Sequence, residues 1–198
     1  MTHAASHEMT HEQATDDRVM FGFWVYLMTD LLMFAVLFAA YAVLQGSTIG
    51  GPSARDIFNP SLALVNTLLL LTSSFTCGIG MIAARRGDKS QTMRWFGITL
   101  ALGMAFLLVE SYELIELVLD GHGPGVNAFL SSFFALVGTH GLHIIFGLIW
   151  GGVTLWFVRK RGLNRHMVRK FALLSLFWHF LDIVWIFIFS VVYLMAFV

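Results

Sequence analysis

Apolar positions run through this chain in five long blocks, separated by short polar connections. The blocks cover residues 19–44, 62–84, 95–119, 129–158 and 171–198. Each exceeds the roughly 20 residues that an α-helix needs to cross the apolar core of a bilayer. Backbone groups in lipid must be hydrogen-bonded within their own segment, whereas the strands of a barrel would alternate over about 10 residues. The pattern therefore predicts five transmembrane helices.

The prolines and the composition agree with this division. Pro52, Pro60 and Pro124 all fall between the apolar blocks, where residues that interrupt helices are expected. The chain is 58% hydrophobic and 12% charged, which is about half the charged fraction of a typical soluble domain. We therefore expect an all-α, multi-pass membrane protein, with a mobile polar tail over residues 1–18 and one transmembrane domain over residues 19–198.

Lysine and arginine are distributed very unevenly over the polar connections. The tail, the second connection and the fourth connection together hold eleven of the twelve basic residues, and the first connection holds the other one, Arg55. Short connections rich in lysine and arginine stay on the cytoplasmic side of a membrane. The split predicts a cytoplasmic N-terminus and an external C-terminus, and it supports the count of five because a different count would place basic connections on both sides.

Seven ionisable residues lie inside the predicted spans. An ionised side chain at the bilayer centre costs about 2.5 to 3.5 kcal/mol on insertion scales, so each needs a partner, water or neutralisation. The seven are Asp30, Glu110, Glu113, His140, His143, His179 and Asp182. From a rise of about 1.5 Å per residue, we expect Asp30, His179 and Asp182 in one layer and the other four in a second layer.

Equal depth leads to a specific hypothesis for the second layer. We predict that the third and fourth spans are cross-linked by Glu110 with His143 and by Glu113 with His140. Asp182 or His179 of the fifth span would complete this intramembrane polar network.

Two further patterns concern packing. Trp178 and Trp185 are seven residues apart, hence on one face of a helix, which is typical of a packing seam. Small residues at four-residue spacing let helix backbones approach closely in lipid. Such pairs are Ala35 with Ala39, Gly97 with Ala101 and Gly147 with Gly151.

The histidines raise the question of a metal or haem site. His140 and His143 lie on one helix, so they cannot be the two opposed ligands of a single haem. His179 is predicted at another depth, and a di-iron site would need Glu-x-x-His pairs on two helices. We therefore expect no catalytic, cofactor-binding or metal-binding residue in the spans. In the tail, the i, i+4 spacing of His3, His7 and His11 suits a transition metal only if that segment is helical.

Three function classes stay open at this point. The buried acids and imidazoles favour a structural hydrogen-bonded network, with lipid binding or proton handling by the same carboxylates as variants of it. An autonomous membrane haem or metal oxidoreductase is the enzyme alternative. An ion or proton transporter is the third class.

Three stretches carry a family resemblance. "FGFWVYLMTD", "ALVGTHGLHIIFG" and "SLFWHFLDIVWIFIFSVVYLM" occupy residues 21–30, 135–147 and 175–195. They resemble the first, fourth and fifth helices of subunit III of the haem-copper respiratory oxidases, in particular of the bo-type ubiquinol oxidases. Subunit III of cytochrome c oxidases commonly has two further N-terminal helices, so the shorter form favours the quinol branch, with the cytochrome c branch as the alternative.

The resemblance implies a non-catalytic subunit of the aerobic respiratory chain, in the bacterial cytoplasmic membrane, without haem or copper of its own. It implies subunit I as the partner that holds the haems and copper and pumps protons, with subunits II and IV as further partners and no nucleic acid.

The resemblance also assigns expected roles to individual features. The family binds phospholipid in a cleft between its first two helices and the rest, and is thought to maintain stability and proton uptake. Asp30 matches the membrane carboxylate near that cleft, and the polar residues of the family motifs are matched by His140, His143, His179 and Asp182.

Overall fold

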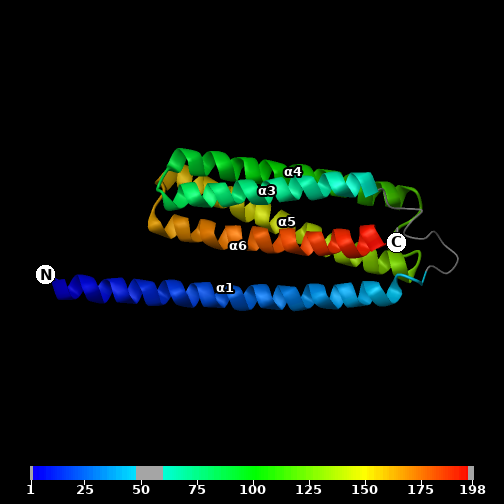
Figure 1. The fold of residues 1–198 in the computed structure, drawn as a ribbon, viewed down its shortest axis with the longest axis horizontal. Coiled ribbons are helices and arrows are strands. Elements are labelled where there is room, and N and C mark those ends of the chain that lie inside the picture. Colours follow the sequence, from blue (N-terminus) through cyan, green and yellow to red (C-terminus); the bar gives the residue numbers. More distant parts are fainter. Residues whose placement is uncertain (1, 48–59, 196–198) are drawn as a thin grey trace.

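Long helices make up this molecule. The computed structural model describes the backbone of residues 2–47 and 60–195 and the side chains of residues 17–47 and 61–195. Its helices are α1 (Thr2–Leu44), α3 (Pro60–Arg85), α4 (Lys89–Leu119), α5 (Ala128–Arg161) and α6 (Arg165–Ile188), and α6 continues into the π-helix η1 (Phe189–Leu194). They run along a common axis, and consecutive helices point in opposite directions (Figure 1).

The predicted fold class is confirmed within these ranges. Five segments are long and apolar enough to cross a membrane, namely Asp17–Leu44, Ser61–Arg85, Lys89–Leu119, Ala128–Arg161 and Arg165–Leu194. Helices α4 and α6 begin several residues before their apolar blocks, because capping rather than hydropathy sets their first residue. The side chain of Asp88 accepts from the N–H of Gln91, and that of Asn164 accepts from the N–H of Met167.

The N-terminal boundary is less simple than predicted. Helix α1 reaches back to Thr2, so the segment expected to be a tail continues the backbone of the first span. The side chains of His3, His7 and His11 lie outside the described residues, as does Arg55. The division at residue 18, the mobility of the tail and a metal bound there all stay predictions.

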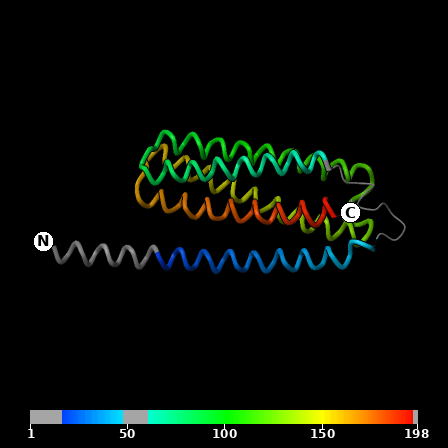
Figure 2. The backbone as a smooth tube through the Cα atoms, viewed as in Figure 1, coloured from blue at the N-terminus to red at the C-terminus, as the bar shows by residue number. Residues whose placement is uncertain are grey.

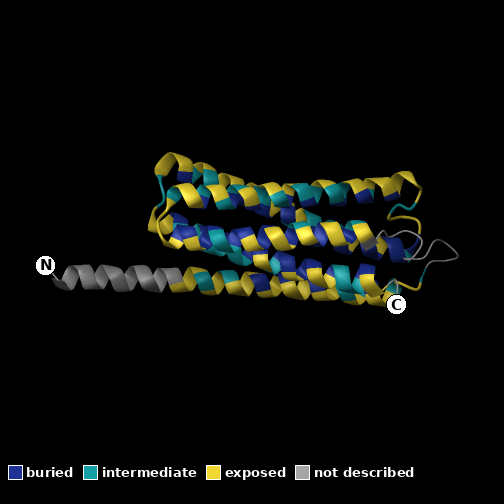
Figure 3. Cartoon of the chain, turned by 45° about the horizontal axis from the view of Figure 1, so that its top comes forward, coloured by how far each residue is buried: buried dark blue, intermediate teal, exposed yellow. Residues whose placement is uncertain are grey.

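Helix α1 lies at the edge of the bundle. It packs mainly on α5 and less on α6, whereas α3 packs closely on α4 and also on α6 (Figures 1 and 2). Only 22% of the most apolar window of α1 is buried, against 50% for the last span. Exposed residues accordingly cover most of the surface of α1 over residues 17–44 (Figure 3). The bundle therefore consists of four mutually packed helices with a fifth laid against one side.

The predicted tryptophan seam is confirmed. Trp178 and Trp185 are both buried on α6, facing α3. The indole N–H of Trp178 donates to Ser73 Oγ at 3.1 Å, and that of Trp185 donates to Thr67 Oγ1 at 3.1 Å. Each large ring thus has its polar atom satisfied by a small hydroxyl of the neighbouring helix, which joins α6 to α3 at two levels.

The small-residue prediction is confirmed only for α5. A Cβ atom at Gly147 would lie 3.1 Å from the ring of Trp178, and one at Gly151 would lie 2.6 Å from Leu100. Gly97 has nothing within 4 Å of such an atom. The alanines of the other two pairs are exposed; these are Ala35, Ala39 and Ala101. Those two predicted close approaches do not occur within the described residues, because the small residues face outward.

The two ends of the bundle differ in charge. The α3–α4 and α5–α6 connections lie at the same end as the first half of α1 (Figure 1). These segments hold most of the lysines and arginines, so we call this the basic end. There Lys160 lies 4.3 Å from the ring centre of Trp156, and Arg161 and Lys170 lie over the ring of Phe157. Which end faces the cytoplasm stays a prediction.

Helix length exceeds the thickness of the apolar core of a bilayer. Helix α5 has 34 residues and is therefore about 51 Å long at about 1.5 Å per residue. The hydrocarbon core is about 30 Å thick, so an upright α5 must extend beyond it. Its final residues, Arg159, Lys160 and Arg161, are all basic and suit the headgroup region.

Candidate functional site

A polar pair joins α1 to α5 at membrane depth. Asp30 Oδ2 lies 3.7 Å from His143 Nε2, and both side chains are largely buried. His143 Nδ1 lies 2.7 Å from the carbonyl oxygen of Thr139 and must donate to it. The ring of Phe34 packs on this imidazole with centroids 5.3 Å apart. The separation of 3.7 Å from Asp30 is too long for a hydrogen bond, so a charge pair requires an ionised carboxylate and a second ring proton, on Nε2.

Glu110 of α4 faces α3. Its Oε2 accepts a hydrogen bond from Asn66 Nδ2 of α3 at 2.9 Å, and both residues are buried. Sequence reasoning missed Asn66, because a single uncharged amide inside an apolar span was given no weight. Its polar side chain among the leucines of the first half of α3 was the available signal.

His140 has an aromatic environment. It is fully buried on α5, and its ring contacts Trp185, Phe106 and Phe34 at centroid distances of 5.4, 5.9 and 6.4 Å. Neither ring nitrogen has a hydrogen-bond partner among the described residues. The imidazole is therefore held by ring packing rather than by a carboxylate.

The predicted pairing of glutamates with histidines is wrong. Glu110 bonds to Asn66 instead of His143, and His143 faces Asp30 of α1 instead of α4. His140 makes no hydrogen bond to Glu113 within the described part of the chain. The predicted layers are also wrong for Asp30 and His143, which were assigned to different depths but lie 3.7 Å apart. In addition, the rotation of each helix about its axis decides which side chains meet.

Asp182 and His179 lie on the side of α6 that faces α3. Asp182 is buried near Ser74 of α3 and near His179 of its own helix, while His179 is exposed. The intramembrane polar residues thus fall into contacts of α1 with α5, of α3 with α4 and of α3 with α6. Whether they act together as one network stays a proposal.

The polar side chains do not converge on a metal site. Within residues 17–47 and 61–195, no three histidine, cysteine, aspartate or glutamate side chains are placed to hold a metal ion. The single cysteine, Cys77, is buried on α3. The expected absence of a cofactor from this chain stays a prediction.

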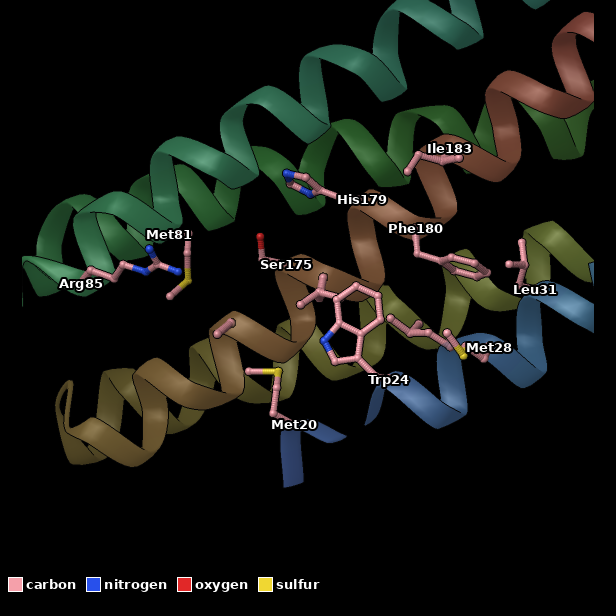
Figure 4. Close-up of a pocket in the computed structure, with 13 residues that line it drawn as sticks. Met20, Trp24, Met28, Leu31, Met81, Arg85, Ser175, His179, Phe180 and Ile183 are labelled. Carbon is pink, nitrogen blue, oxygen red and sulfur yellow. The ribbon is translucent and has the colours of Figure 1, made fainter. Parts of the chain in front are cut away.

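A cavity opens between α1 and the pair α3 and α6. Its volume is about 470 Å³, and Figure 4 shows its lining side chains. Its walls are apolar, with Met20, Trp24 and Leu31 from α1 and Phe180 from α6. Three polar side chains also line it, which are Arg85 of α3 and Ser175 and His179 of α6.

The cavity and the membrane carboxylate lie on different faces of α1. Asp30 is not among the described residues that line the cavity, since its carboxylate points to His143 of α5. The cavity also has α1 on one side and α3 on the other, whereas the family resemblance implies a cleft with the first two spans on the same side. The close packing of α3 on α4 accounts for this difference.

Comparison with known proteins gives consistent matches along the chain. Residues 1–197 match the sequence profile described as "Cytochrome c oxidase subunit III". The chain is 49% identical over 194 residues to "Cytochrome bo(3) ubiquinol oxidase subunit 3" of Pseudomonas aeruginosa, covering 98% of this chain and 93% of that protein. A protein of the same description from Pseudomonas putida is 49% identical over 175 residues, which is 88% of this chain and 84% of the relative.

A relative whose name gives cytochrome c, instead of ubiquinol, as the electron donor has nearly the same sequence identity to this chain. "Cytochrome c oxidase subunit 3" of Bacillus sp. (strain PS3) is 46% identical over 177 residues, which cover 89% of this chain and 86% of the relative. The extent of the match therefore does not by itself separate the two branches. Since the profile covers residues 1–197 and the identities to full-length relatives reach 46% and 49%, the chain belongs to the cytochrome c oxidase subunit III family.

Proposed function

We propose that this chain is the non-catalytic subunit 3 of a proton-pumping bo-type ubiquinol oxidase in the aerobic respiratory chain of a bacterial cytoplasmic membrane. The identity of 49% over 98% of the chain to the Pseudomonas aeruginosa subunit carries the proposal. In this role it packs on subunit I, which holds the haems and copper, with subunits II and IV as further partners. It supports the stability of the complex and proton uptake, with the N-terminus in the cytoplasm.

Two alternatives differ from this proposal in testable ways. The relative from Bacillus sp. (strain PS3) favours subunit III of a cytochrome c oxidase as the second candidate. An autonomous haem or metal oxidoreductase has weaker support, because in the described structure His143 contacts Asp30 and its own backbone and His140 contacts aromatic rings.

Purification of the assembly tests all three readings. An affinity-tagged copy of the chain, extracted from aerobically grown cells in a mild detergent, is expected to bring a haem-containing complex with it. That complex should consume oxygen with ubiquinol as the donor and should not oxidise reduced cytochrome c. Oxidation of cytochrome c would replace the proposal by its second candidate. A chain that purifies alone, with or without haem, would contradict membership of an oxidase complex.

We further propose that the cavity between α1 and α6 holds an acyl chain of a phospholipid. Its apolar walls suit a hydrocarbon chain, and Arg85 lies where α3 ends, at the depth of a headgroup. A guanidinium group can bind a phosphate through two parallel hydrogen bonds. Asp30 would then affect lipid binding indirectly, because its contact with His143 helps to hold α1, one wall of the cavity, against α5.

Replacing Arg85 by glutamine is expected to weaken phospholipid retention about tenfold, since loss of a charge-assisted hydrogen bond costs about 1.5 kcal/mol or more. Native mass spectrometry of the complex during stepwise detergent washing measures the retained lipid. Arg86→Gln is a matched control, because Arg86 follows directly in the sequence and lines a different hollow, beside Asp88 and Trp95. Equal retention in the Arg85 variant and the wild type, or equal loss in both variants, would contradict the assignment.

A further inference from the structure

Helix α4 carries four acidic residues along one side. Glu110, Glu113, Glu116 and Asp120 follow each other at steps of three, three and four residues, which keeps them on neighbouring positions of a helical surface. We call them the acidic ladder. Their exposure rises along the helix, from 2% at Glu110 and 9% at Glu113 to exposed side chains at Glu116 and Asp120. The ladder thus leads from the interior of the bundle to the end opposite the basic end.

The inner part of the ladder meets a buried amide. Asn66 of α3 is completely buried, and its Nδ2 donates to Glu110 Oε2 at 2.9 Å. Three oxygens have no hydrogen-bond donor among the described residues, namely Asn66 Oδ1, Glu110 Oε1 and Glu113 Oε2. All three are acceptors unless a carboxyl group carries a proton. The site therefore has more buried acceptors than donors.

Within the described part of the chain, neither glutamate pairs with a lysine or an arginine of the other elements packed around it. The buried phenol of Tyr193, on η1, lies close enough to Glu110 and Glu113 to feel the charge of either carboxylate. Tyr41 of α1 also lies near this phenol. On α5, the buried His140 is enclosed by the rings of Phe106 and Trp185. The negative charge of Glu116, the next acid of the ladder, also repels a negative charge on Glu113.

A bound proton resolves the excess of acceptors. Two ionised carboxylates that share a buried site repel each other, and a buried charge without a partner is costly. Protonation of Glu110 or Glu113 removes one of the two charges and creates an O–H donor. That donor can serve one of the three oxygens that otherwise have no partner.

We propose that Glu110, Glu113 and Asn66 form a binding site for an exchangeable proton, and that Glu116 and Asp120 connect this site to water at the end of the bundle where α4 ends. All residues of the proposed site belong to this chain, and the proposal needs no cofactor of a partner. It lies toward the opposite end of the membrane from the basic connections.

Infrared spectroscopy of the purified complex that contains the full chain tests the site. We expect a carboxylic-acid C=O band that shifts in D₂O and that loses intensity in Glu110→Gln or Glu113→Gln. Glu116→Gln should keep this band but slow its exchange with deuterium at least several-fold. Asp88→Asn is the control, because it changes an exposed acid at the other end of α4 and keeps a good helix cap. Its band and its exchange rate should equal those of the wild type.

Three results would overturn the proposal. The first is an unchanged band in the Glu110→Gln, Glu113→Gln double variant, which would mean that both carboxylates are ionised. The second is a band that appears only when sodium is replaced by choline at constant pH, because the site would then bind a metal cation. The third is exchange at the wild-type rate in Glu116→Gln, which would remove the connection to water.

A measurement on the unmodified chain covers the case in which the glutamine variants do not assemble. An apolar carbodiimide adds to protonated carboxyl groups, and peptide mass spectrometry locates the adducts. Under mildly acid conditions we expect an adduct on Glu110 or Glu113, and it should decline as the pH rises. Modification of Glu116 with neither inner glutamate modified would show that the reagent reached the ladder, and it would overturn the proposal.

Discussion

Replacing Trp178 by alanine is expected to lower the free energy of unfolding of the bundle by about 3–5 kcal/mol, the usual cost of truncating a buried tryptophan. The ring is only 2% exposed and fills the space left by Gly103 and Gly147. Its N–H also donates to Ser73 Oγ. Because lipid tails are as apolar as the ring, van der Waals packing and this hydrogen bond, rather than the hydrophobic effect, account for the loss.

Unfolding of the purified protein in mild detergent by increasing fractions of a denaturing detergent measures this change. Trp156→Ala is the matched control, since Trp156 is 52% exposed and packs beside Lys160 near the basic end. We expect the control to change the unfolding free energy by less than about 1 kcal/mol, as for most exposed positions. Similar losses in the two variants would mean that Trp178 does not hold the helices together.

Replacing Gly103 by alanine is expected to destabilise the bundle by about 1–3 kcal/mol, the usual cost of adding a methyl group to a tightly packed interior. The new Cβ atom would lie 2.5 Å from Cζ2 and 2.7 Å from Cη2 of Trp178. The same ring is bounded by Gly147 of α5, where a Cβ atom would lie only 3.1 Å away. A rigid indole held from both sides cannot move aside cheaply, so α4 and α6 must separate slightly.

The same detergent titration checks this prediction against two references. Gly97→Ala, on the same helix, adds a methyl group with nothing within 4 Å and should be neutral or slightly stabilising. In a Trp178→Phe background the cost of Gly103→Ala should fall by at least about 0.5 kcal/mol, since contacting residues couple by about that amount or more. An equal cost of Gly103→Ala in the wild type and in the Trp178→Phe variant would mean that the strain does not come from contact with the indole ring.

The fold was largely predictable because few backbone structures can cross a membrane. Backbone groups in lipid must be bonded within a helix, so the five apolar blocks alone predicted the five spans. Helical geometry similarly placed Trp178 and Trp185 on one face and brought Gly147 and Gly151 into close contacts. These predictions depend on a single helix at a time, where spacing along the sequence determines position.

The contacts between helices were harder to predict for a physical reason. Residue count gives only an approximate height of a side chain in the membrane, and it does not give the direction in which its helix presents it. Glu110 was therefore assigned to His143, whereas it bonds to Asn66, and Asp30 was not assigned to His143. Small neutral partners such as Ser73 carry no signal in the sequence, because a serine inside a span can also bond to the backbone of its own helix.

The excess length of α5 gives the two ends of the bundle different tolerance to membrane thickness. At one end Arg159, Lys160 and Arg161 have long side chains that can bend toward the headgroups from several heights. At the other end the short carboxylates of α4 have little reach, so sinking Glu116 or Asp120 into hydrocarbon would be costly. A thicker bilayer is therefore accommodated at the basic end, where the helices can slide or tilt relative to the headgroups. At the opposite end the acidic residues of α4 keep a constant distance from water.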